Sequence, residues 1–350
     1  MNSTFRPARR RVFGGLAAAG LWAACPLVGE RGGGLARAQA RGPARPVRIV
    51  GNQAVENATL WELMREQGYF EAFSIEPTLI NAGSPEKTLE AIVNGDGDIC
   101  MIAGFNGVPS AIEQGAPVKI VGSALRIPNL AVYTAARSDI RSLRDLEGKT
   151  VGIGPVNSLL HQTMVALLRK KGVAVEKVKF VVIGSNAMVF KALSSGEVDA
   201  GPADVSYTGN LAKLGVRVVE GGEMWSELPE YLYQTAFASN DAIAKKRDTL
   251  VGTMAAFARL FRFISTPESK EPYLQARSRV TKGAGMTEGE TVWNFFQKQQ
   301  PYATDLMVTE RQIAYRQELN VSMGMQKKTL PFTQITDMSL ARDALNLLRG

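Results

Sequence analysis

The sequence predicts an α/β protein whose chain forms two doubly wound lobes joined by a hinge of two chain crossings. The first observation behind this prediction is a length of 350 residues with 45% hydrophobic content, which favours two domains with substantial cores. The second is an internal repeat, and the third is the alternation of strand-like and helix-like segments within each copy. Strands separated by helices imply parallel sheets with right-handed crossovers.

The repeat is visible when the sequence is aligned with itself at an offset of 101 residues. Four identities then coincide: Ser84 with Ser185, Ala91 with Ala192, Gly95 with Gly196 and Asp98 with Asp199. A repeat of this length indicates two structural units of similar build. We expect lobe one to comprise residues 45–134 and 235–350, which include the C-terminal helices, and lobe two to comprise residues 135–234.

The elements follow in order along each copy. Apolar β-type runs predict strands, apolar residues at helical spacing predict helices, and Gly95 and Gly196 supply the left-handed residue that ends a helix. In the first copy, strands over 47–50, 74–80 and 98–102 alternate with helices over 59–67 and 85–94. In the second, strands over 150–153, 178–183 and 199–203 alternate with helices over 158–171 and 187–195. Segments 130–135 and 231–238 are the predicted crossings, and helices over 249–264 and 290–299 are expected to pack mainly on lobe one.

The first 40 residues have the composition of a cleavable export signal. Four arginines precede an apolar run over 12–24, and small residues at Ala38 and Ala40 suit a cleavage site that would release the protein into the periplasm. Arg10 and Arg11 fit the twin-arginine pattern, which a receptor reads as an address. Lipid attachment at Cys25 is the rival interpretation.

Removal of this segment changes the charge balance. Residues 1–40 hold six Arg and one Glu, so the net charge of +8 falls to +3 and the support for nucleic-acid binding disappears. Of the two cysteines only Cys100 would remain, in an apolar stretch typical of a buried small hydrophobic residue.

Ligands of open parallel sheets bind beyond the carboxyl ends of the strands. The loops in that position supply neutral hydrogen-bonding groups and flat apolar surface, which suit a small molecule held between the lobes. The candidate ligand-binding residues are Asn52, Gln53, Asn57, Phe105, Asn106, Asn157, Ser158, His161, Asp204 and Tyr207.

Asn57 and Ser158 are equivalent under the offset of 101, each just ahead of a predicted helix, so both are also expected to cap helices. His161, the only histidine, would lie in the first helical turn, where the helix dipole favours a neutral ring. No second histidine, cysteine pair or carboxylate cluster accompanies it in the sequence. We therefore predict a binding protein with no catalytic residue, metal or cofactor.

A family resemblance rests on two motifs of the second copy. Residues 143–152 read LRDLEGKTVG and are followed by Ser158 and His161, and residues 192–200 read ALSSGEVDA. With matching features in the first copy, the pattern over 47–263 resembles the periplasmic solute-binding proteins of the nitrate, sulfonate and taurine type. The resemblance implies a type II periplasmic binding fold and delivery of a small-molecule ligand to an ABC transporter permease, and we expect a monomer.

The resemblance also implies that the loop over 154–161 holds an acidic head group through backbone N–H groups. The sequence departs from the family at 201–207, where members often carry tryptophan and an Asp-Pro pair. An anion would here depend on helix N-termini and Arg126, whereas Glu56 and Asp204 favour an amine or a heteroaromatic ring, and both alternatives stay open. Two other classes remain: an enzyme on the same fold, such as a pyrimidine-precursor synthase or a dehydratase, and a ligand-binding sensor subunit.

Overall fold

The computed structural model describes residues 43–52 and 54–349. The predicted export signal with its cleavage positions and Cys25, and the candidate site residue Gln53, lie outside the described residues. Within the described ranges, no helix combines the length and the apolar character needed to cross a bilayer.

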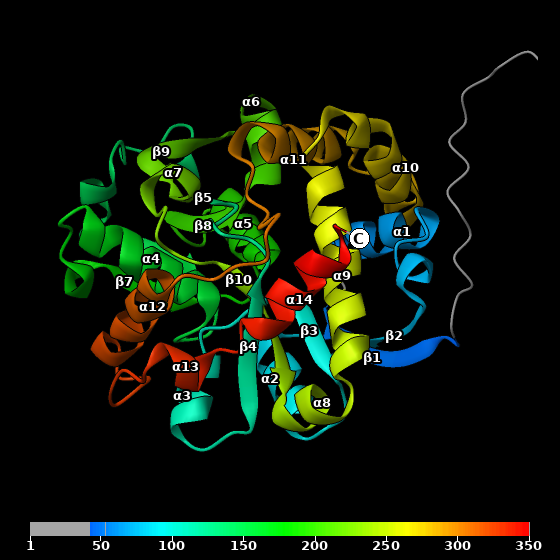
Figure 1. Cartoon of the computed structure of the whole chain (residues 1–350). Coiled ribbons are helices and arrows are strands. Elements are labelled where there is room, and N and C mark those ends of the chain that lie inside the picture. The colour runs from blue at the N-terminus through cyan, green and yellow to red at the C-terminus, as the bar shows by residue number, and fades with distance from the viewer. Residues whose placement is uncertain (1–42, 53, 350) are drawn as a thin grey trace, which may run out of the picture. The chain divides into compact units, whose positions relative to one another are not determined.

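Two five-stranded sheets form the framework, one in each lobe (Figure 1). The first sheet has the order β2-β1-β3-β10-β4. Its strands are β1 Arg45–Gly51, β2 Ile75–Asn81, β3 Ile99–Gly104, β4 Val118–Ser123 and β10 Gln234–Ser239. The second sheet has the order β7-β6-β8-β5-β9. Its strands are β5 Leu130–Ala135, β6 Thr150–Ile153, β7 Lys179–Val182, β8 Ala200–Asp204 and β9 Val216–Glu223.

The two sheets share one topology. β1, β2 and β3 are parallel, as are β6, β7 and β8, and in each sheet the fourth strand, β10 or β5, is antiparallel to both of its neighbours. That fourth strand follows a chain crossing, because β5 comes after β4 and β10 comes after β9. The predicted fold of two doubly wound α/β lobes is confirmed.

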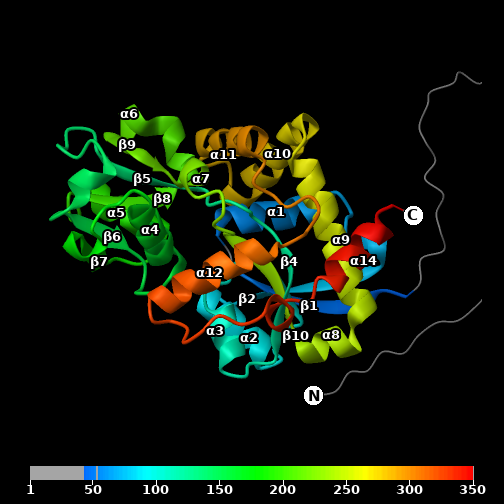
Figure 2. The same ribbon diagram turned by 60° about the vertical axis from the view of Figure 1, so that its left-hand side comes forward.

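Helices cover both sheets (Figure 2). In chain order they are α1 Val55–Glu66, α2 Pro85–Val93, α3 Val108–Glu113, α4 Leu159–Lys170, α5 Asn186–Ser194, α6 Leu211–Leu214, α7 Met224–Glu227, α8 Asn240–Lys245, α9 Arg247–Ile264, α10 Lys270–Thr281, α11 Met286–Gln299, α12 Glu310–Ser322, α13 Phe332–Ile335 and α14 Ser339–Leu347. The longest, α9, is buried along most of its length and packs against α1 and α14.

The repeat has a structural counterpart at the helices that follow β2 and β7. α2 and α5 each have nine residues, and the hydroxyl oxygens of Ser84 and Ser185 cap them by accepting from backbone N–H groups three residues on. Asp98 and Asp199 accept from the backbone N–H groups of Arg48 and Thr150, at 2.8 and 2.7 Å. Asp98 thus ties the start of β3 to β1, and Asp199 ties the start of β8 to β6.

The repeat is shifted at the preceding helices. α4 begins 104 residues after α1, so the loop before α4 is longer than its counterpart. Ser158 is the N-cap of α4, as expected, but the N-cap position of α1 is Ala54, and Asn57 lies inside the first turn. The predicted capping role of Asn57, and its equivalence to Ser158, are therefore wrong.

The hinge contains a third segment beside the two predicted crossings. Leu125, between β4 and β5 and ahead of the predicted crossing 130–135, accepts from the backbone N–H of Gln234 at 2.9 Å. Its neighbour Ala124 accepts from the backbone N–H of Ala303 at 2.8 Å. The C-terminal helices also reach lobe two. Asn210 donates to Glu288 of α11 at 3.3 Å, and Asn320 of α12 accepts from Gln162 of α4 at 2.9 Å.

Candidate functional site

A cavity of ≈ 710 Å³ lies between the lobes. Lobe one contributes loops after β1, β2 and β3, and lobe two contributes loops after β6, β7 and β8. These are the carboxyl ends of the parallel strands, where ligands of open α/β sheets bind. The volume is in the range of small-molecule sites, roughly 300–1,000 Å³.

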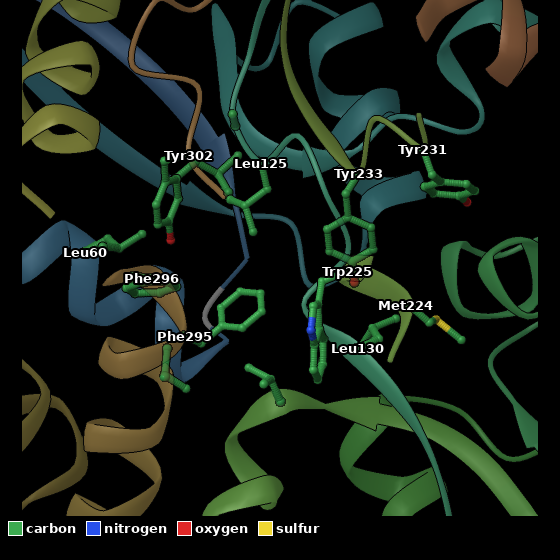
Figure 3. Packing of buried hydrophobic residues seen from close by; sticks show 14 of the residues in the cluster. Leu60, Leu125, Leu130, Met224, Trp225, Tyr231, Tyr233, Phe295, Phe296 and Tyr302 are labelled. Atoms are coloured by element: carbon green, nitrogen blue, oxygen red, sulfur yellow. The ribbon is translucent and has the colours of Figure 1, made fainter. Parts of the chain in front are cut away.

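Aromatic side chains from the hinge and from α11 form one wall of the cavity. Tyr302 and Phe296 lie with their ring centroids 5.0 Å apart at 67°, and Tyr302 stacks on Phe261 behind it at 5.0 Å and 17°. Figure 3 shows Tyr302 beside Leu125, its partner in an isolated β-bridge, with Phe296 next to them. Tyr233 also lines the cavity.

Lobe one places a carboxylate in the cavity. Glu56, in the first turn of α1, accepts at Oε2 from Tyr273 Oη at 2.7 Å and from Arg277 Nη1 at 3.2 Å. Its Oε1 is buried and has no hydrogen-bond partner among the described residues. Burial raises the pKa of Glu56 to about 7, although the charge of Arg277 and the Tyr273 hydroxyl act in the opposite direction.

Lobe two places a second carboxylate in the cavity, because Asp204 ends β8 and begins the 3₁₀ turn Val205–Asn210. Its Oδ1 accepts from the Ser206 backbone N–H at 2.9 Å and its Oδ2 from Asn129 Nδ2 at 2.8 Å. Burial raises the pKa of Asp204, while the bonds from Ser206 lower it. In the described part of the chain, no Lys or Arg forms an ion pair with this carboxylate.

The cavity brings together four of the residues predicted from the sequence: Asn52, Asn57, Ser158 and Asp204. Asn57 Nδ2 donates to Asn52 Oδ1 at 2.8 Å, so this bond fixes the two side-chain amides relative to each other at the N-terminus of α1. Ser158 lines the cavity and caps α4 at the same time, because its hydroxyl accepts from the His161 backbone N–H at 3.5 Å.

Two predicted residues lie in the core or at the lobe interface, away from the cavity lining. Phe105 is completely buried, and the guanidinium of Arg316 lies 5.1 Å from its ring. Asn106 is buried and donates through Nδ2 to the backbone oxygen of Asn157, which joins lobe one to lobe two at 2.8 Å.

Tyr207, which was expected to offer flat surface to a ligand, stacks on Phe190 instead. Their ring centroids are 3.7 Å apart and the planes differ by 4°. Tyr133 lies edge-on to both rings, at 6.3 Å from Tyr207. The Tyr207 side chain therefore fastens the turn after Asp204 to the core of lobe two.

His161 holds the loop ahead of α4. Its Nδ1 accepts from the backbone N–H of Asn157 at 2.9 Å, and its ring lies edge-on to Phe180 at 5.0 Å. Burial lowers the pKa of His161. A ring nitrogen that accepts from a backbone N–H must be unprotonated, which agrees with the neutral ring expected from the sequence.

The bond from Asn157 to His161 accompanies an unusual backbone conformation, since Asn157 has φ 66. Asparagine tolerates this left-handed region and alanine does not, at a cost of about 1 kcal/mol. We expect Asn157→Ala to lower the free energy of unfolding by that amount and the control Asn157→Gly to stay within a few tenths. Urea denaturation measures both, and equal losses in the two variants would show that φ is not the reason.

The remaining reactive groups stand apart from the cavity. Cys100 is buried in β3, and burial raises the pKa of its thiol to about 12. Nowhere in the described part of the chain do three or more His, Cys, Asp or Glu side chains gather as metal ligands. The cavity offers the carboxylates of Glu56 and Asp204, the exposed carboxylate of Glu86, amide groups and aromatic faces.

Comparisons with known proteins agree with this architecture. The sequence model of the family described as NMT1/THI5 like matches residues 63–265. A search of curated proteins found no match.

Solved structures share the fold at low sequence identity. The periplasmic aliphatic sulphonate binding protein SsuA from Escherichia coli has 18% identity and a TM-score of 0.67, with 83% of this chain and 92% of that chain covered. The alkanesulfonate-binding protein SsuA from Xanthomonas axonopodis pv. citri, bound to MOPS, has 16% identity and a TM-score of 0.66, with 85% and 99% covered. The desulfurization enzyme DSZB has 15% identity and a TM-score of 0.64, with 87% and 99% covered. The chain belongs to the NMT1/THI5-like family and has the two-lobed α/β fold of periplasmic binding proteins.

Proposed function

We propose that the chain is the solute-binding component of an ABC importer, which captures a small organic molecule between its lobes and delivers it to the permease. The observation that carries this proposal is the cavity of ≈ 710 Å³, because both lobes line it at the carboxyl ends of their strands. A solute that touches both lobes favours the closed state over the open one, which is the difference a permease can recognise.

The site residues proposed for capture come from both lobes and from the hinge. Those predicted from the sequence are Asn52, Asn57, Ser158 and Asp204, and those added by the structure are Glu56, Tyr233, Phe296 and Tyr302. The two lobes are proposed to move as two bodies. In this proposal β5 moves with lobe two because it pairs with β8 and β9, so the first boundary lies before Leu130 and not at the predicted position 134/135. The arginine-containing segment over 1–40 supports export to the periplasm, and similar folds include proteins described as periplasmic sulphonate-binding.

Recovery of bound solute tests this function. We expect the full chain, expressed with its own N-terminal segment and isolated from the periplasmic fraction, to release one small organic compound per protein on denaturation, identified by mass spectrometry. The same compound, added back, should raise the melting temperature. A protein that carries no compound and gains no stability from a metabolite library would contradict capture, and conversion of the compound to a product would instead place the chain with enzymes of this fold.

A further inference from the structure

The two carboxylates that face the cavity come from different lobes and are only partly compensated. Arg277 and Tyr273 both bind Glu56 through Oε2, which leaves Oε1 buried without a partner among the described residues. Asp204 receives only neutral donors, the Ser206 N–H and the Asn129 amide. In the part of the chain that the structure describes, Arg277 is the one cation whose charge acts on both carboxylates: it forms an ion pair with Glu56 and lowers the pKa of Asp204 without bonding to it. A single cation shared by two buried carboxylates leaves one negative charge over, and burying such a charge costs several kcal/mol, so a second cation between the two groups is favourable.

The other charged groups near the cavity do not neutralise the negative charge of these two carboxylates. Glu86 also lines it, and among the described lining residues there is no Lys or Arg. Arg277 lies behind Glu56 and forms its ion pair there, with 8% of its side chain exposed. An anionic group placed between Glu56 and Asp204 would therefore meet like charge from each carboxylate that is ionised, which disfavours an anionic ligand.

The aromatic wall supplies the second half of a cation site. Phe296, Tyr302 and Tyr233 line the same cavity as the two carboxylates. Aromatic faces attract organic cations and bury apolar ligand surface at the same time. A ligand with a cationic head and an apolar body satisfies both features of the lining.

We infer that the solute is an organic ammonium compound; this inference rests on the function proposed above. The protonated amine lies between Glu56 and Asp204, and the apolar body lies against Phe296 and Tyr302. Two of the fold relatives named above are described as sulfonate-binding proteins, whereas this inference assigns a ligand of the opposite charge to the cleft of this chain.

The protonation of Glu56 links binding to pH. The groups that face it are Tyr273 and Arg277 from α10, Asp204 from β8, and Tyr302. Because the free-state pKa of Glu56 is about 7, an ammonium ligand that requires its ionised form displaces a proton near neutrality. Affinity for an amine is expected to rise from pH 6 to pH 8 and to stop rising with pH in Glu56→Gln.

Matched probes test the charge of the ligand. Phenethylamine, 2-phenylethanol and 2-phenylethanesulfonate share one skeleton and differ in the head group, and their binding to the full chain is followed by thermal shift and calorimetry at millimolar concentration. We expect stabilisation by the amine to exceed that by the alcohol, and the sulfonate to give none. Glu56→Gln and Asp204→Asn should each weaken amine binding roughly 10- to 100-fold while the alcohol is unaffected. The control Glu90→Gln removes an exposed carboxylate of the Lys87 pair and should change nothing.

Each other outcome has a definite meaning. Three outcomes would contradict the inference that the ligand is an ammonium compound: preference for the sulfonate, equal binding of amine and alcohol, or release of an anionic compound from the purified protein. None of them would contradict the proposed function of solute capture. A released amine supports the inference even if the phenyl probes are too large. No binding by any probe together with no released compound would contradict the proposed function itself.

Discussion

Cysteines introduced by Gly104→Cys and Leu159→Cys are expected to form a disulfide bond that joins the two lobes and stops solute exchange. Gly104 ends β3 in lobe one, and Leu159 begins α4 in lobe two. A Cβ atom on residue 104 would lie 3.6 Å from Cβ of Leu159, within the disulfide range of about 3.5–4.5 Å. The substitution at 159 also removes the Leu159 Cδ2 atom that would lie 3.0 Å from the new Cβ.

The expected effects are large. The bond would close a loop of about 55 residues, which corresponds to about 4 kcal/mol of added unfolding free energy in the chain-entropy description. Release of bound solute should slow by more than tenfold under oxidising conditions and recover with dithiothreitol, as followed by exchange of labelled solute. Each single cysteine variant is the control, and Cys100 does not compete because it is buried. Normal exchange in the cross-linked protein would show that the cleft does not open at this edge.

The strands could be predicted from local patterns in the sequence. The strand over 150–153 has the predicted bounds, and the strand-like segment 130–135, predicted as a crossing, is the strand β5, because runs of β-favouring residues are flanked by turn residues. The offset of 101 also paired Ser84 with Ser185, and the structure shows that both are N-caps. It failed at Asn57, because the longer loop before α4 shifts the two copies by three residues, and a loop insertion leaves no mark in a pattern of matching residues.

The polar half of the site could be predicted because strand ends define it. Asn52, Ser158 and Asp204 follow strands, and parallel strands bring their carboxyl ends to one edge. Phe296 and Tyr302 could not be found this way, since they belong to a helix and a hinge segment whose approach to the cavity depends on tertiary packing. Phe105 and Tyr207 were misplaced for a related reason. An aromatic residue in a loop can face either the cleft or the core. Here Phe105 packs in the core beside the Arg316 guanidinium, and Tyr207 stacks on Phe190.

Asp98→Asn is expected to destabilise the fold strongly, by about 3 kcal/mol. The Asp98 side chain is 3% exposed and accepts from the Arg48 backbone N–H and Nη2, each at 2.8 Å, and from Lys246 Nζ at 2.9 Å. It thereby joins β3 to β1 and to the start of α9. An amide in its place leaves two cations beside a group without charge, and loss of one member of a buried ion pair costs about 3–5 kcal/mol. We expect the lower end of this range because the side chains of Arg48 and Lys246 are 43% and 37% exposed, so water screens their charges.

The pH dependence of this effect has a definite sign. Burial raises the pKa of Asp98, but the bonds from Arg48 and Lys246 outweigh it and the net pKa is lowered. A carboxylate with a depressed pKa stabilises the fold above its unfolded pKa of about 3.9, and that stabilisation is lost as pH falls through the folded pKa. Urea denaturation should therefore separate the two proteins widely at pH 7 and much less at pH 3. Asp139→Asn removes an exposed partner of Lys149, 78% exposed, and is the matched control. A loss in Asp98→Asn no larger than in that control would mean that the buried carboxylate does not hold β1 and β3 together.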